Sequence, residues 1–204
     1  MTEIVAADPT ARWEDARRVE SWAGEVRVNF IRASAVAAFY GHHLLRQYVL
    51  GGTRTTPEYH QTVTLVAAAW VLLVVALHHA LARRFWPPWL KFGSSALDAA
   101  LVTLLMLPGG GPRSPLAILY FLVLAASALR LSLRLVWATT AFTLLGYLGT
   151  VLFTIVRRPE WRIPHDEQVV FMLGLLGTGL VAGQMVRQAR RLIQGSPVEV
   201  EEAA

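Results

Sequence analysis

Six long apolar segments, separated by polar or turn-forming stretches, constrain this chain more than any other feature of its sequence. We predict membrane spans at residues 28–50, 62–81, 91–107, 115–129, 135–156 and 168–186. One helical crossing of a bilayer needs about 20 apolar residues, so six crossings occupy most of the chain and leave little room for a soluble catalytic domain. The sequence therefore predicts an all-α, polytopic membrane protein with a six-transmembrane-helix bundle at 28–187.

The composition supports a membrane location. Charged residues make up 16% of the chain, whereas a soluble domain carries about 25%. The net charge is +5, but the arginines lie near the ends of the apolar segments, where they meet lipid headgroups, and no nucleic-acid-binding motif is present. We therefore expect lipids and other membrane proteins as partners, and no nucleic acid. Because the chain has no cysteine, disulfides, thiol switches and iron–sulfur clusters are excluded.

The positions of Lys and Arg predict the orientation. With the N-terminus inside, 12 cationic residues flank the cytoplasmic ends of the spans and 6 flank the outer ends. The inner set is Arg12, Arg17, Arg18, Arg27, Arg83, Arg84, Lys91, Arg130, Arg134, Arg187, Arg190 and Arg191, and the outer set is Arg46, Arg54, Arg113, Arg157, Arg158 and Arg162. This excess agrees with the positive-inside rule. We expect a multi-pass protein of the bacterial inner membrane with both termini cytoplasmic.

Two short segments flank the predicted bundle. In the N-terminal arm, 1–27, apolar residues recur at helical spacing and continue into the first span, at Val19, Trp22, Ala23, Val26 and Phe30. This pattern fits an amphipathic helix that lies on the membrane surface or against a partner, and it also fits a solvated helix that leads into the first span. The C-terminal segment, 188–204, is predicted to be a short, acidic cytoplasmic tail.

Asp98 is the most unusual residue within a predicted span, because a carboxyl group inside a bilayer is costly unless it is protonated, paired or hydrated. Arg32, in the first span, lies at a similar depth in the inner half of the membrane. A buried ion pair between Arg32 and Asp98 is the structural interpretation, and proton or ligand chemistry at Asp98 is the functional one. In both interpretations the two side chains face the interior of the bundle.

The adjacent His42 and His43 raise the possibility of a tetrapyrrole such as bacteriochlorophyll, because a neutral imidazole is a good axial ligand. The other histidine pair, His78 and His79, is predicted near the opposite membrane face, which argues against a haem shared by the two pairs. Interfacial histidines without any ligand are the more common case. His60 and His165 are expected in solvated outer loops.

A glycine- and proline-rich turn joins the third and fourth spans. It contains Gly110, Gly111, Ser114 and Pro115, and its backbone can approach a ligand or a neighbouring helix closely. The simpler interpretation is a tight hairpin turn. No P-loop, HExxH or GxSxG motif is present, so we predict that the chain is not an enzyme and holds no metal.

From 92 to 153, and more loosely over all six spans, the chain resembles the membrane input region of redox-responsive sensor histidine kinases of the global photosynthesis and respiration regulator type. In that family an acidic residue in one span precedes a Gly-Gly-x-x-Asn-Pro-Phe turn that is associated with quinone sensing. Here Asp98 precedes the turn, and Gly110, Gly111, Ser114, Pro115 and Leu116 occupy the motif positions, with Ser114 in place of the amide and Leu116 in place of the aromatic ring. The resemblance implies a sensor-type bundle with a ligand site at these residues.

In the kinases of that family the last span leads into a catalytic core, whereas this sequence ends at Ala204, soon after Arg191. We therefore expect a non-catalytic accessory or structural subunit of a larger membrane complex, either respiratory or a photosynthetic reaction centre–antenna assembly. The alternative is a stand-alone sensor for a quinone or another apolar ligand that signals through a separate partner chain. A transporter is a weaker hypothesis because the spans contain few polar residues along a pathway.

Overall fold

The structure is a computed structural model that describes residues 9–50, 56–83 and 87–195. Within these ranges the fold is all-α, as predicted, and contains six α-helices and three short 3₁₀-helices. The α-helices are α1 (Pro9–Tyr48), α2 (Pro57–Ala82), α3 (Leu90–Met106), α4 (Ile118–Ala128), α5 (Leu133–Arg157) and α6 (His165–Gly195), and the 3₁₀-helices are η1 (Gly111–Arg113), η2 (Pro115–Ala117) and η3 (Pro159–Trp161).

The helix α1 runs without interruption through the expected N-terminal arm and the first span. Trp22, Val26 and Phe30, which belong to the apolar pattern of the arm, are exposed on α1. The buried face of the same segment instead carries Glu25 and Arg32. The buried face of this segment therefore mixes these polar side chains with apolar ones such as Val28 and Val36. Residues 1–8 of the arm and 196–204 of the tail lie outside the described residues, and the tail is helical up to Gly195.

Three helices in the described part of the chain are long and apolar enough to cross a membrane by length and composition, namely α2, α5 and the part of α6 from His165 to Leu192. The others depart from that pattern for visible reasons. The helix α1 carries buried charges, α3 has 17 residues that include Lys91 and Asp98, and the apolar segment Pro115–Ala128 is short. Helices α3 and α4 thus miss this criterion by their length, and α1 misses it by its charged residues.

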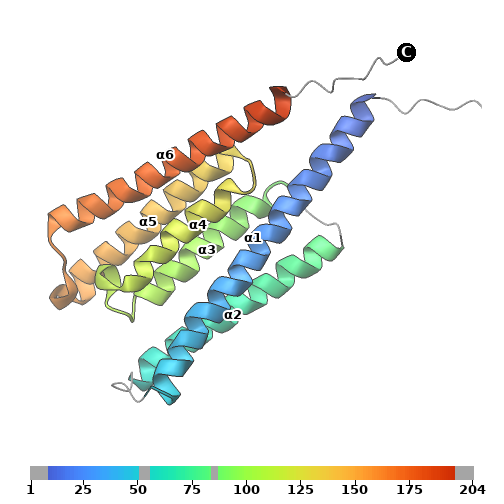
Figure 1. Cartoon of the computed structure of the whole chain (residues 1–204). Helices are drawn as coiled ribbons and strands as arrows, with labels where there is room; N and C mark the ends of the chain where they lie inside the picture. The colour runs from blue at the N-terminus through green and yellow to red at the C-terminus, as the bar shows by residue number, and fades with distance from the viewer. Residues whose placement is uncertain (1–8, 51–55, 84–86, 196–204) are drawn as a thin grey trace, which may run out of the picture.

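The helices divide into two groups (Figure 1). Helix α5 packs against α3, α4 and α6, and these helices form what we call the four-helix unit, α3–α6. Helices α1 and α2 form a hairpin that contacts this unit mainly through α2 against α3 and α1 against α4. We call the end of the bundle that holds the α4–α5 turn the terminal end, and the opposite end, where α1 leads towards α2, the loop end.

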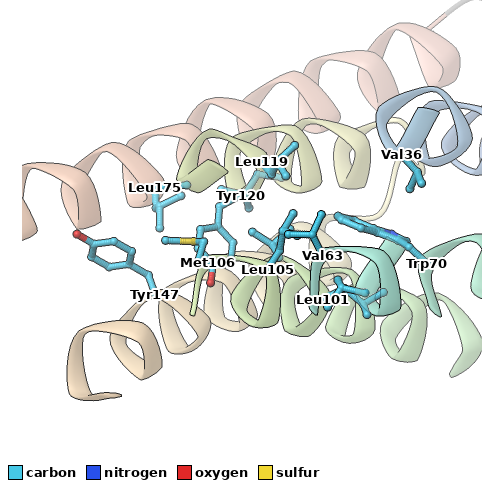
Figure 2. Packing of buried hydrophobic residues seen from close by; sticks show 14 of the residues in the cluster. Val36, Val63, Trp70, Leu101, Leu105, Met106, Leu119, Tyr120, Tyr147 and Leu175 are labelled. Atoms are coloured by element: carbon cyan, nitrogen blue, oxygen red, sulfur yellow. The ribbon is translucent and has the colours of Figure 1, made fainter. Parts of the chain in front are cut away.

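The hydrophobic core extends from the hairpin into the four-helix unit (Figure 2). Val63 and Trp70 of α2 lie against Leu101 and Leu105 of α3, and deeper in the unit Met106, Tyr120 and Leu175 are fully enclosed. The Tyr120 hydroxyl lies 2.7 Å from Thr103 Oγ1, so the polar end of the largest buried side chain has a partner.

At the loop end, the glycine-rich turn bends the chain from α3 into α4 through η1 and η2. Gly110 and Gly111 have φ angles of 100° and 60°, a region that strongly favours glycine. A Cβ atom on Gly111 would also lie 2.6 Å from Thr154 Oγ1, so the turn packs directly on the end of α5. Ser114 Oγ then accepts a hydrogen bond from the Leu116 amide, which fixes the start of η2. These two glycines therefore serve the packing of the turn.

Candidate functional site

A buried ion pair ties the hairpin to the four-helix unit. Arg32 of α1 donates from Nε to both carboxylate oxygens of Asp98, each at 2.8 Å, and its Nη2 lies 2.6 Å from Asp98 Oδ2. Trp70 of α2 donates its indole N–H to Asp98 Oδ1 at 3.1 Å. One carboxylate thus joins α1, α2 and α3. Because the charges are paired and bonded, this group acts as a structural link in the interior.

A second buried ion pair lies nearer the terminal end. Arg130, in the α4–α5 turn, lies with its Nε 2.9 Å from Oε2 of Glu25 on α1. Its Nη1 donates to Ser95 Oγ at 2.7 Å and to the Lys91 carbonyl at 3.1 Å, and its Nη2 donates to Ser94 Oγ at 3.1 Å. The arginine therefore connects α1, the start of α3 and the turn. These polar contacts together hold the hairpin at this end of the bundle.

Burial controls the protonation of this second pair. Loss of water contact raises the pKa of Glu25 above its ordinary value, and the positive charge of Arg130 opposes the shift. Burial likewise lowers the pKa of Arg130 to about 10, against the favourable effect of Glu25. The guanidinium remains charged at neutral pH.

A cavity of about 270 Å³ lies between the hairpin and the four-helix unit towards the loop end. Its deep part is apolar and reaches Trp70, and its mouth carries polar and basic side chains. The lining comes from α1, α2, the end of α3 and the segment that leads into α4: Ala35, Val36, Phe39, Tyr40, His42, His43, Arg46, Tyr59, Val63, Val66, Ala67, Trp70, Leu105, Gly109, Ser114, Pro115, Leu116 and Leu119. An apolar site with a few convergent polar groups is typical of small-molecule binding.

Histidine contacts close one side of the mouth. His43 Nε2 lies 3.0 Å from His60 Nδ1, and the two rings stack with centroids 5.2 Å apart. The hydroxyl of Tyr48 lies 3.4 Å from His60 Nε2. The expectation that His60 is solvated in a loop is therefore wrong, because it lies in the first turn of α2 and contacts α1. In the ranges that the structure describes, no three His, Asp or Glu side chains come together as a metal site.

The family model described as the PilS-like transmembrane domain matches residues 19–189 of this sequence. The chain belongs to this family. The family is the six-span membrane input domain of PilS sensor kinases, so this is a multi-pass integral membrane protein with a sensor-type bundle. Comparison with curated proteins and with solved structures finds no match.

In this PilS-like domain the predicted site residues fall into two groups. His42, His43, Ser114 and Pro115 all line the cavity, although they come from distant parts of the sequence. Gly110 and Gly111 are not among the lining residues and instead shape the turn behind Ser114. Asp98 is paired with Arg32 and does not line the cavity. Trp70 lines the cavity and donates its indole N–H to Asp98. Nε2 of His43, one of the two ring nitrogens that could bind the metal of a tetrapyrrole, already contacts His60 Nδ1.

Sequence reasoning missed several residues of the domain. Tyr40, Arg46 and Tyr59 at the cavity mouth carry no motif, and only the folded hairpin brings them together. The pairing of Glu25 with Arg130 is likewise not predicted, because both residues fall outside the predicted spans. One feature of the sequence could have indicated it. Ser94 and Ser95 lie one helical turn before Asp98, so a polar stripe on α3 continues towards the terminal end, where Arg130 lies.

Proposed function

We propose that this chain is a membrane sensor module that takes a small apolar or amphipathic ligand from the bilayer and signals through a partner chain. The cavity between the hairpin and the four-helix unit is the observation that carries the proposal. The family match supports it, since the family is the input domain of sensor kinases. A quinone is one ligand class that fits a largely apolar cavity, and the resemblance noted above points to the same class.

The positions of the two ion pairs suggest how ligand binding in the cavity could move the hairpin. Both pairs hold α1 on one side of the cavity, which lies between α1, α2, the end of α3 and η2 towards the loop end. A ligand that fills this space wedges the hairpin outward and uses the ion pairs as a pivot. The 40 residues of α1 form a helix about 60 Å long, so a small rotation at the loop end displaces its terminal end.

We place the module in the bacterial inner membrane with both termini cytoplasmic, as the distribution of cationic residues indicates. In this orientation the terminal ends of α1 and α6 face the cytoplasm, where a signalling partner can contact them. The cavity then lies in the outer half of the bilayer. Ligands dissolved in the outer leaflet therefore have the shortest path to it.

Distance measurements between spin labels test the wedge directly. Because the chain has no cysteine, Leu45→Cys on α1 and Ile118→Cys on α4 create a single labelled pair at exposed positions on either side of the cavity. In nanodiscs, we expect added decylubiquinone or bacterial lipid extract to shift the distance distribution of this pair. The control pair, Ile118→Cys with Leu152→Cys, lies within the four-helix unit and should not move. The variant Ala35→Phe, which narrows the cavity, should remove the response.

The accessory-subunit hypothesis predicts a different result. A subunit of a respiratory or photosynthetic complex would co-purify in fixed stoichiometry with that complex in mild detergent. Its hairpin distance would remain the same with every ligand and in the Ala35→Phe variant. That combination would overturn the sensor proposal. The family match favours the sensor over this hypothesis.

A further inference from the structure

The charge distribution of the cavity restricts the ligand that it can hold. His42, His43 and Arg46 line the mouth, and none of the described lining residues is Asp or Glu. The described residues also include no carboxylate in an ion pair with Arg46. The mouth therefore presents a permanent positive charge and two imidazoles to whatever enters, and it offers a ligand no negative group.

The deep part of the cavity is mostly apolar, with Ser114 as a buried polar residue of the lining. Val36, Val63, Val66, Leu105 and Leu119 line it, and its volume of about 270 Å³ lies just below the range of sites for drug-sized ligands. Trp70 has a polar N–H, but this group already donates to Asp98. Asp98 itself is neutralised by Arg32, so it repels an anion only weakly. A ligand with its polar group at the mouth and an apolar part inside therefore fits this lining best.

We propose that the cavity binds an acyl-chain amphiphile with an anionic headgroup, a phosphate or a carboxylate, held beside Arg46. The inference rests on the proposed function in that it names the ligand of the same cavity. A cation at the edge of a bilayer gains most from a direct anionic partner, and a guanidinium binds phosphate or carboxylate through two parallel hydrogen bonds. A neutral quinone leaves this charge without a partner. The acyl chain fills the space between Val36, Val63 and Leu119.

Lipid titrations of the full chain in a neutral detergent test this inference. Thermal stability is measured against dioleoyl phosphatidylglycerol, dioleoyl phosphatidylcholine, oleate and decylubiquinone. We expect the anionic amphiphiles to reach half-saturation at a concentration about tenfold below that of phosphatidylcholine, since one charge-assisted hydrogen bond contributes this much. Oleate and phosphatidylglycerol share the required chemistry, and the one that binds more tightly identifies the source.

Matched variants separate the cavity from general attraction of anionic lipid to a basic protein. Arg46→Gln should abolish the preference for anionic amphiphiles, and Arg46→Lys should retain part of it. Arg157→Gln removes the same charge from an exposed residue at the end of α5 that does not line the cavity, and it should keep the full preference. Ala35→Phe should weaken binding of every amphiphile.

The possible results decide the two proposals separately. Equal half-saturation by phosphatidylglycerol and phosphatidylcholine, or an unchanged preference in Arg46→Gln, overturns the anionic ligand. Tighter binding of decylubiquinone with a shift in the hairpin distance also overturns it, but leaves the sensor proposal standing. An Arg46-dependent preference without any shift in the hairpin distance supports the anionic ligand and contradicts the sensor role.

Discussion

The contacts within the four-helix unit, α3–α6, differ from those that join this unit to the hairpin, α1–α2. Within the four-helix unit the helices approach closely at glycines. A Cβ atom on Gly146 of α5 would lie 2.6 Å from Thr103 Oγ1, and one on Gly179 of α6 would collide with Thr140. The hairpin approaches the unit closely at Gly24, where an added Cβ atom would lie 3.1 Å from the Leu129 carbonyl oxygen. It is further linked by the apolar packing of α2 on α3 and by the long side chains of Arg32 and Arg130, and the cavity opens between the two parts towards the loop end.

From this difference we expect the four-helix unit to be rigid and the hairpin to be movable relative to it. Close approach of small residues yields many short van der Waals contacts, and these tolerate little displacement. A guanidinium on a flexible stem can keep its partner while the helix backbone rotates. The comparison predicts that damage to the packing of the four-helix unit destabilises that unit, whereas loss of the polar links releases the hairpin.

Loss of one partner in the Arg32–Asp98 pair should have the largest effect. In Asp98→Ala, Arg32 keeps a buried charge without its partner and Trp70 loses its acceptor, so we expect a loss of about 3–5 kcal/mol in unfolding free energy. Thermal unfolding in detergent micelles measures it. If the pair is a polar link, a spin-label pair across the cavity should also broaden its distance distribution.

The double variant Arg32→Met with Asp98→Leu is the control for that prediction. It replaces both charges by apolar groups, and such replacements of buried pairs are often neutral or stabilising. We expect it to recover most of the stability lost in Asp98→Ala. If the double variant is as unstable as the single one, the pair stabilises the bundle through the packing of its side chains rather than through their charges. The distinction between a polar link to the hairpin and close packing in the four-helix unit would then not hold.

A side chain at Gly146 should have an intermediate effect, confined to the four-helix unit. In Gly146→Ala the new Cβ atom meets Thr103 Oγ1 and Tyr120, which are bonded to each other, so we expect a loss of about 1–3 kcal/mol from overpacking. Gly149→Ala, one turn further along α5, meets nothing within 4 Å and should cause no loss. Equal unfolding temperatures for the two variants would show that the helices of the unit have room to separate.

The sequence predicts much of the fold because the hydropathy of a span depends mainly on its own residues. The centres of all six predicted spans fall within the six helices. The largest differences at the ends are at α1, which begins at Pro9 rather than 28, and at α6, which ends at Gly195 rather than 186, because both helices continue past the apolar segments. The juxtaposition of Arg32 and Asp98 also followed from local information, since their depths could be counted from the ends of their segments.

The cavity could not be predicted in this way. It depends on how far the hairpin is separated from α3 and η2, and this spacing is a property of the packed bundle rather than of any one segment. His60 shows the same limit, because its contact with His43 depends on where α2 begins. The apolar pattern at Trp22 and Phe30 fits both a surface helix and a helix that leads into the first span. Only the structure shows one continuous helix, α1, whose buried face carries Glu25 and its contact with Arg130.

The smallest expected effect concerns the protonation of Glu25, and it tests whether the hairpin is held by charge at the terminal end. Burial raises the pKa of Glu25 in the folded state above its value in the unfolded state, so the folded protein binds this proton more tightly. The contribution of this group to stability is therefore fully present below pH 4.5 and is lost as the pH rises through the folded-state pKa. Glu25→Gln cannot titrate, and we expect its unfolding temperature to lack this part of the pH dependence.

The quantity to measure is the difference between the unfolding temperatures of wild type and Glu25→Gln from pH 4 to 8, since other carboxylates contribute equally to both proteins. If wild type instead gains stability relative to Glu25→Gln as the pH rises over this range, the attraction of Arg130 outweighs burial, and the terminal end holds the hairpin more firmly than a movable part allows.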